Sequence, residues 1–155
     1  MQFAFTDEQA MIAETARAFF TEQATSERTR AAMAADGIDH ALWAAFCQEL
    51  GLAGVAVPED LGGAGLGLVE LAILFEAAGA QVSALPMLGS LGLCGQALVH
   101  GGCAAQQADW LPRLVSGEVI AGYVHDAALS ADGDHLVDHV REQRGVLHCR
   151  SQART

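Results

Sequence analysis

The stretch with the clearest chemical potential is a glycine-rich run at residues 62–67, which reads Gly-Gly-Ala-Gly-Leu-Gly. It follows a short apolar stretch at 52–57 and precedes a helical pattern, which is where a dinucleotide-binding turn would present backbone N–H groups to phosphate. Its spacing is not Gly-x-Gly-x-x-Gly, and no further β-α-β pattern follows it. The sequence therefore favours a tight structural turn in which two backbones approach closely. A Gly-loop nucleotide-binding domain is the less favoured alternative.

A second group of side chains is of the type that binds metal ions. Zinc prefers imidazole and thiolate ligands, and a His-x-x-x-His pair presents both rings to one side on a helix. The turn-like residues around Leu136 and Val137 do not predict a helix, so we assign no metal site. We interpret Glu70 and Glu76 as a solvated helix face rather than an acid/base pair, and we assign no catalytic residue. The residues considered as metal ligands are His125, His135, His139, His148 and Cys149.

Composition narrows the class of protein. A chain of 155 residues that is 52% hydrophobic can form one domain with a real core. All eight basic residues are Arg, which excludes a P-loop lysine, and a net charge of −11 argues against nucleic acid as a partner. No apolar run reaches the roughly 18 residues of a membrane span, and no basic n-region begins the chain. We interpret Cys47 and Cys94 as small buried hydrophobes in a reducing cytoplasm.

Hydrophobic periodicity predicts a helical body that is followed by one strand. Thr6 and Gln9 form a capping box at the start of the first helix, and Asp39 is the expected cap of the third. Trp43 and Phe75 lie on apolar stripes and are expected to be core anchors. The predicted helices span about 7–23, 26–37, 39–50, 68–79, 86–100 and 104–115, and the predicted strand spans 119–124.

The last fifteen residues differ from the rest of the chain. Residues 1–140 hold four Arg against eighteen acidic residues, a net charge of −14, whereas residues 141–155 hold four Arg against Glu142 alone, a net charge of +3. The tail also has no sustained period of two or 3.6, so it presents no face to bury. We expect residues from about Asp126 onward not to fold as a unit, because of a truncation or a shifted reading frame.

Four motifs, in this order and at this spacing, resemble the acyl-CoA dehydrogenase family over about residues 3–125. The two glycine-containing motifs are the more specific ones, and the order of all four strengthens the resemblance. The motifs are Phe5-Thr6-x-x-Gln9, Trp43 with Glu49-Leu50-Gly51-Leu52, Val57-Pro58-Glu59-Asp60-Leu61-Gly62-Gly63-Ala64-Gly65-Leu66, and Trp110-Leu111-Pro112-Arg113-Leu114-x-Ser116-Gly117-Glu118.

This resemblance implies an all-α, N-terminal helical bundle domain over residues 1–117, followed at 118–155 by an incomplete start of a middle β domain. Enzymes of this family use FAD to oxidise the Cα–Cβ bond of an acyl-CoA thioester, in which a carboxylate removes the α proton and flavin N5 accepts hydride. Family chains carry a Thr-Glu-Pro…Gly-Ser-Asp element after the first β-strand, but residues 124–129 here read Val-His-Asp-Ala-Ala-Leu. We therefore assign no cofactor-binding residue, and we expect the chain alone to bind no FAD and to be inactive.

The resemblance also suggests where a substrate could lie. The predicted helix 86–100 carries glycines at positions 89, 92 and 95, each of which costs a helix about 1 kcal/mol, so something should pack closely on that face. Close helix packing is the favoured interpretation. The family places the equivalent helix near the acyl tail, which makes Gly89, Ser90 and Leu93 the candidate lining of a substrate pocket, with room for a bulky or ring-bearing acyl group. The resemblance implies a role in the β-oxidation of fatty acids or sterol side chains. Acyl-CoA and acyl-CoA dehydrogenase subunits, in a homo- or hetero-oligomer, are the expected partners, and a non-catalytic helical interaction module is the rival function.

Overall fold

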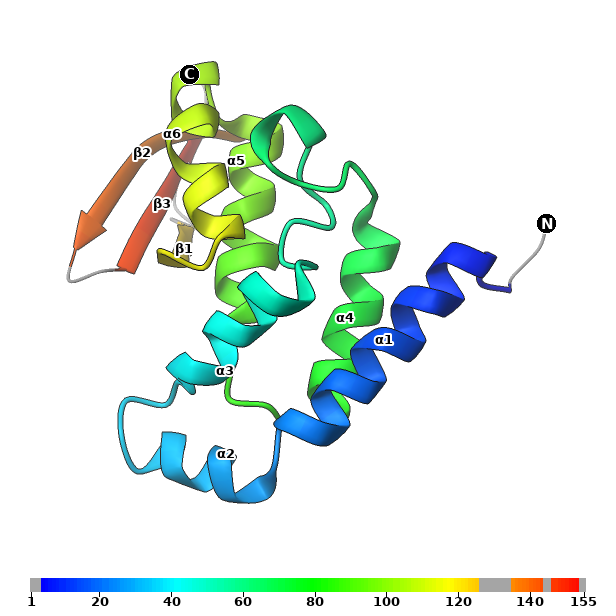
Figure 1. Cartoon of the computed structure of the whole chain (residues 1–155). Helices are drawn as coiled ribbons and strands as arrows, with labels where there is room; N and C mark the ends of the chain where they lie inside the picture. Colours follow the sequence, from blue (N-terminus) through cyan, green and yellow to red (C-terminus); the bar gives the residue numbers. More distant parts are fainter. Residues whose placement is uncertain (1–3, 126–134, 144–145, 154–155) are drawn as a thin grey trace.

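The structure, a computed structural model, describes residues 4–125, 135–143 and 146–153 (Figure 1). Its helical elements are α1 (Asp7–Gln23), α2 (Ser26–Met33), α3 (His40–Ala45), η1 (Phe46–Leu50), η2 (Glu59–Leu61), α4 (Leu68–Ala80), η3 (Leu88–Gly95), α5 (Gln96–Gly101) and α6 (Ala104–Val115). Its strands are β1 (Ile120–His125), β2 (His135–Gln143) and β3 (Val146–Ala153). The expected helical domain is confirmed, and α1 and α6 have the predicted bounds.

Local capping explains where the first helices begin. The Gln9 amide donates to Thr6 Oγ1 at 3.2 Å, and the Thr6 amide donates to Gln9 Oε1 at 3.1 Å, so the predicted capping box is present. The second helix differs from the prediction, because Thr25 rather than Ser26 caps it and it ends at Met33. A turn fills the interval up to Gly37, whose φ of 88° suits a residue that ends a helix.

An aromatic cluster joins α1 to the continuous segment α3–η1. The Phe20 and Phe46 rings stack with centroids 5.7 Å apart, and Trp43 stacks on Phe46 at 5.9 Å. Trp43 is only 2% exposed, so its prediction as a core anchor is confirmed. Phe75 was predicted wrongly, because it is only partly buried at the edge of this core. Helix α4 turns Leu71, Leu74 and Ala78 inward instead.

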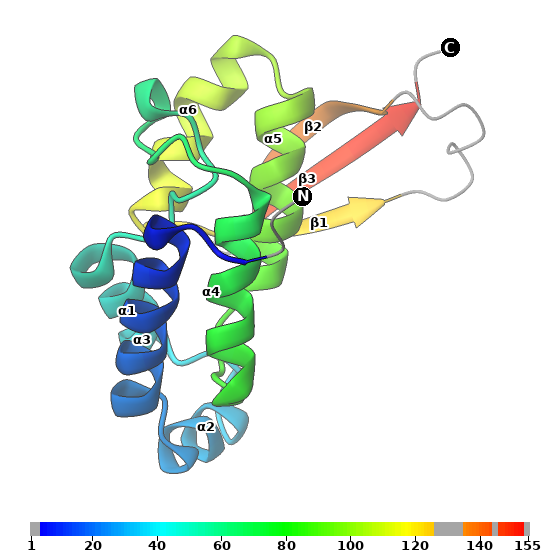
Figure 2. The same cartoon turned by 90° about the vertical axis from the view of Figure 1, so that its right-hand side faces the viewer.

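A second core lies under α5 and α6. Its buried members come from the loop before η2, from η3, α5 and α6, and from the start of the sheet: Val57, Cys94, Leu98, Leu111, Leu114, Val119 and Ala121. Figure 2 shows the strands on the η3–α5 side of the molecule, away from α1. The first strand is thus part of the packing of the helical body. Cys47 is a buried free thiol as predicted, but Cys94 is bonded in a disulfide, so the expectation of a reduced thiol is wrong there.

The strands form one sheet in the order β1-β3-β2. Strand β3 is parallel to β1, with Ile120 opposite Val146, and antiparallel to β2, with Gln143 opposite Val146. This pairing differs from the expectation of no fold beyond Asp126, because a backbone ladder needs hydrogen-bond partners and does not need an alternating apolar face. The division of the chain at residues 117 and 118 stays a proposal. Weak amide protection across residues 126–150 in the isolated chain also stays a prediction, which hydrogen exchange tests.

Candidate substrate-binding face

The glycine-rich loop is held by its own backbone. Each N–H group from residue 62 to residue 67 donates a hydrogen bond within the chain, at donor–acceptor distances of 2.8 to 3.1 Å. The acceptors are Glu59 O, Pro58 O, Gly54 O, Val57 O and Val55 O in chain order, and Glu70 Oε2 for the last amide. A phosphate cradle needs free amides that point at the ligand. This loop has none to offer, which removes the basis of the nucleotide-binding alternative.

Gly63 explains why the loop is rich in glycine. A Cβ atom at this position would lie 2.0 Å from Val57 O and 2.6 Å from Gly54 O, far inside van der Waals contact. The loop therefore folds back on the segment 54–57 at backbone-to-backbone distance, as the sequence suggested. Its role is to fix the path of the chain between η1 and α4.

Ser90 fastens the first strand to helix η3. Its side chain is fully buried, its Oγ donates to Ala121 O at 3.1 Å, and it accepts from the Ala121 amide at 2.8 Å. A Cβ atom on Gly89 would lie 3.2 Å from the same carbonyl oxygen. The glycine-rich face at this point thus packs on the strand, and both hydrogen-bonding functions of Ser90 are used there.

Loss of the Ser90 hydroxyl should destabilise the contact between helix and strand. We expect Ser90→Ala to lower the free energy of unfolding by about 1–3 kcal/mol, because it leaves a buried amide and carbonyl without partners. Ser83→Ala is a matched control, since its hydroxyl makes one bond, to Ala78 O, in a partly buried position. Chemical denaturation checks both variants. An equal effect of the two substitutions would contradict the role assigned to Ser90.

The three predicted pocket residues do not share one cavity wall. Ser90 is buried, Gly89 is half-buried against the strand, and Leu93 is 46% exposed on the outside of the helix. A better candidate lies beside them, in an apolar groove of about 260 Å³ between the end of α4 and the start of η3. Its lining is Phe75, Ala78, Gly79, Ser83, Leu85, Met87 and Leu88. Sequence reasoning did not identify Phe75 as a groove residue. Its ring lies over Gly92, so the spacing of the glycines in η3 was the available clue.

Two carboxylates of α4 and one buried thiol have structural or solvated environments. The Glu70 carboxylate caps α4 by accepting from the Gly67 amide at 2.9 Å, and it also accepts from Gln9 Nε2 at 2.7 Å. These hydrogen bonds, first of all the one from Gln9, hold its pKa below the usual value. Glu76 is exposed on the same helix, as predicted for a solvated face. Burial raises the pKa of the Cys47 thiol to about 12, so it stays protonated and unreactive.

The histidine-rich segment lies mostly in the sheet. His135 and His139 belong to β2, and His148 belongs to β3 with its Cα opposite those of Gly122 and Arg141, whereas the side chains of these residues lie outside the described part. Among the described side chains, no three His, Cys, Asp or Glu residues gather as metal ligands would. No helix in the described ranges is both long and apolar enough to cross a membrane.

The glycine-rich loop does not fit the pyrophosphate of a flavin cofactor. A pyrophosphate needs free backbone donors or cationic side chains, and the glycine-rich loop is saturated by internal hydrogen bonds. Residues 126–129, which stand where the family carries its flavin-contacting element, lie outside the described range. The structure therefore gives no basis for assigning a flavin contact to this loop.

These features indicate the class of protein. It is an all-α domain that supports a small sheet, and its described part carries no catalytic group of residues. Comparison with known proteins is more specific. The acyl-CoA dehydrogenase N-terminal domain model matches residues 6–118. The chain belongs to the acyl-CoA dehydrogenase family, whose members are oxidoreductases.

Individual relatives agree with this assignment. Acyl-CoA dehydrogenase IpdE2 from Mycobacterium tuberculosis is 35% identical over 129 residues, which cover 83% of this chain and 40% of the relative. A variant of the Tcur3481-Tcur3483 steroid ACAD has 37% sequence identity and a TM-score of 0.70, and the match covers 76% of this chain and 32% of that one. An acyl-CoA dehydrogenase complexed with FAD from Bacillus anthracis has 28% identity and a TM-score of 0.70, with coverage of 86% and 25%. The chain thus spans about 40% of the length of the curated relatives it matches first.

Proposed function

We propose that this chain is the N-terminal helical part of an FAD-dependent enzyme that oxidises the Cα–Cβ bond of an acyl-CoA thioester. It acts either as a fragment of such an enzyme or as one subunit of a pair, and it is inactive alone. The single observation that carries the proposal is the continuous family match over residues 6–118. No chemical step is assigned to the residues of this chain, because no described group is placed to move a proton or a hydride.

The role of the domain in this proposal is to form one wall of the acyl site. Leu88 and Leu93 are 62% and 46% exposed, and exposed apolar side chains next to an apolar groove are typical of a surface that receives another molecule. The groove between α4 and η3 contains no charged side chain in its lining. Such a surface suits the hydrocarbon part of an acyl group and does not suit the nucleotide part of CoA.

The substrate class that we propose is a bulky, ring-bearing acyl-CoA, such as a sterol side-chain intermediate. The support comes from the steroid ACAD relative at 37% identity and from the apolar groove of about 260 Å³ beside Phe75. The proposed partner is a subunit of the same family, because that relative and the ChsE4-ChsE5 complex from Mycobacterium tuberculosis are both named as pairs of two components. We propose a cytoplasmic location, with neither nucleic acid nor membrane among the partners.

A chimera tests this function. Residues 1–117 of this chain replace the matching domain of Mycobacterium tuberculosis IpdE2, and oxidation of a ring-bearing acyl-CoA is followed with an artificial electron acceptor. We expect turnover by the chimera, and we expect Leu88→Glu within it to lower kcat/KM by about tenfold or more, because a carboxylate in an apolar groove disfavours the acyl group. Val69→Glu is the matched control, since Val69 is also exposed (54%) but does not line the groove. A folded chimera without activity, or equal losses for the two variants, would contradict the proposal and favour a non-catalytic interaction module.

A further inference from the structure

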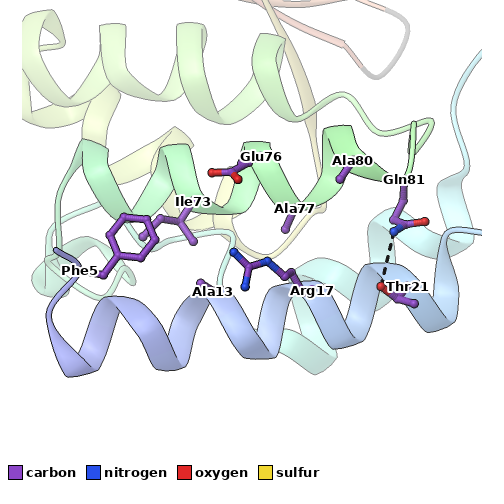
Figure 3. Close-up of a pocket in the computed structure, with 9 residues that line it drawn as sticks. All are labelled: Phe5, Ala13, Arg17, Thr21, Ile73, Glu76, Ala77, Ala80 and Gln81. Atoms are coloured by element: carbon purple, nitrogen blue, oxygen red, sulfur yellow. Dashed lines mark hydrogen bonds between the residues drawn. The ribbon is translucent and has the colours of Figure 1, made fainter. Parts of the chain in front are cut away.

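A second cavity lies on the other side of α4, in the groove where α1 packs along it (Figure 3). Its volume is about 120 Å³. Alanines form much of the floor, and Phe5 and Ile73 form an apolar end. The lining residues are Phe5, Ala13, Arg17, Thr21, Ile73, Glu76, Ala77, Ala80 and Gln81. It shares no residue with the groove assigned above to the acyl group.

Two hydrogen bonds join α1 to the facing helix α4 and its C-terminal end. One lies outside this cavity, and the other lies at one end of it. Near the start of both helices, Gln9 Nε2 donates to Glu70 Oε1 at 2.7 Å. At the opposite end, Gln81 Nε2 donates to Thr21 Oγ1 at 3.5 Å. Each of these polar side chains has a partner on the opposite side. These hydrogen bonds fix the register of the two helices, and Arg17 and Glu76 do not contribute to it.

The two charged side chains that line the cavity have no ion-pair or hydrogen-bond partner among the described residues. Arg17 comes from α1 and Glu76 from α4, and in Figure 3 the Arg17 side chain extends toward α4, where Glu76 lies. The ion pairs of the described residues involve neither of them, although an Arg and a Glu on facing walls could pair by a change of rotamer. Neither side chain has a hydrogen-bond partner in the part of the chain that the structure describes. A guanidinium and a carboxylate thus stand at one cavity, each with its hydrogen-bonding capacity free.

We propose that this cavity binds a small apolar zwitterion of the α-amino-acid class. Arg17 would donate to its carboxylate, and Glu76 would accept from its ammonium group. The alanines, Ile73 and Phe5 would cover its aliphatic side chain. A closed cavity of roughly 150 Å³ accommodates about six non-hydrogen atoms. A partly open cavity of about 120 Å³ therefore suits the short aliphatic side chain of such a ligand, while its two charged groups lie at the open side.

Charge selects a zwitterion over a simple ion. A carboxylate alone would meet Glu76 and a chain whose net charge is −11, and an ammonium alone would meet Arg17. A ligand with both charges satisfies both side chains at once. Because it would contact α1 and α4 together, its binding would stabilise the packing of these helices. This inference does not depend on the acyl-CoA function.

The test is calorimetric titration of the whole 155-residue chain with L-valine. Isovalerate, which lacks the ammonium group, and isobutylamine, which lacks the carboxylate, are the matched ligands. We expect saturable binding of L-valine with a Kd on the order of 1 mM, and binding at least about tenfold weaker for both of the other ligands. Saturating L-valine should also raise the melting temperature. Absence of saturable binding of L-valine, or equal binding of isovalerate, would overturn the proposal.

Variants locate the site. Arg17→Gln and Glu76→Gln should each weaken L-valine binding by about tenfold or more, and Ala80→Leu should abolish it by filling the cavity. Arg30→Gln and Glu22→Gln are the controls, because both residues are exposed charges outside the cavity. Arg17 and Glu76 are exposed, so their variants should melt at the same temperature as the parent in the absence of ligand. Binding that survives in all three cavity variants would place the ligand elsewhere and overturn the assignment.

Discussion

Substitution of Gly63 by alanine is expected to leave little folded protein. The added Cβ atom would lie 2.0 Å from Val57 O and 2.6 Å from Gly54 O, and its position is fixed by the backbone, so no rotamer relieves the contact. If the loop moved away from the segment 54–57 to relieve this contact, the hydrogen bonds that the Gly63 and Gly65 amides donate would break. We expect a loss of about 4 kcal/mol or more, a large part of the stability of an ordinary domain.

The control for Gly63 is its neighbour. Gly62 has a φ of 87°, but an added Cβ atom there would meet nothing within 4 Å. Gly62→Ala should therefore cost only the strain of a left-handed alanine, about 1–2 kcal/mol. Circular dichroism melts of both variants separate the two effects. If Gly63→Ala melts no lower than Gly62→Ala, the close approach of the loop to the segment 54–57 is not present in solution.

Truncation of Trp43 is the second substitution with a large expected effect. The ring is 2% exposed and stacks on Phe46, so Trp43→Ala should lower the free energy of unfolding by about 3–5 kcal/mol through lost burial and the remaining cavity. Denaturant titration of the variant measures this loss. An unchanged midpoint would show that the indole is not in the core.

Trp43→Phe distinguishes the contribution of the apolar ring from that of the indole N–H group. The indole Nε1 is buried without a hydrogen-bond partner, and such an orphan donor costs about 1–3 kcal/mol. Phenylalanine removes this donor and keeps most of the apolar volume. We therefore expect Trp43→Phe to cost less than half of the loss caused by Trp43→Ala. A Phe variant as unstable as the Ala variant would mean that the Nε1 proton has a partner in solution.

Capping and periodicity were sufficient to predict the helical body. The Thr6 and Gln9 box fixed the start of α1, and Gly51 ended the third helical segment with a φ of 69°. The burial of Phe75 was predicted wrongly. An apolar stripe indicates which residues share a helix face, but it does not indicate which of two neighbouring faces packs against the core. The exposed side of α4 is itself apolar at Leu68 and Val69, so the pattern alone did not distinguish the faces.

The candidate site was less predictable than the fold. The sequence identified the helix with three glycines, but the hydroxyl of Ser90 finds its partners in Ala121, thirty-one residues further along the chain. Contacts at that separation depend on how the strand packs against the helix, which local spacing does not encode. For the same reason, the cavity between Arg17 and Glu76 gave no signal in the sequence, since it exists only where α1 lies along α4.

We propose that this chain supplies the helical domain of an acyl-CoA dehydrogenase and holds no flavin by itself. The visible absorption spectrum, measured on the purified 155-residue chain and on the IpdE2 chimera that carries residues 1–117, tests it most directly. We expect no flavin band for the chain and about one flavin per protomer for the chimera. A yellow isolated chain with stoichiometric flavin, or a folded chimera that holds none, would contradict the claim.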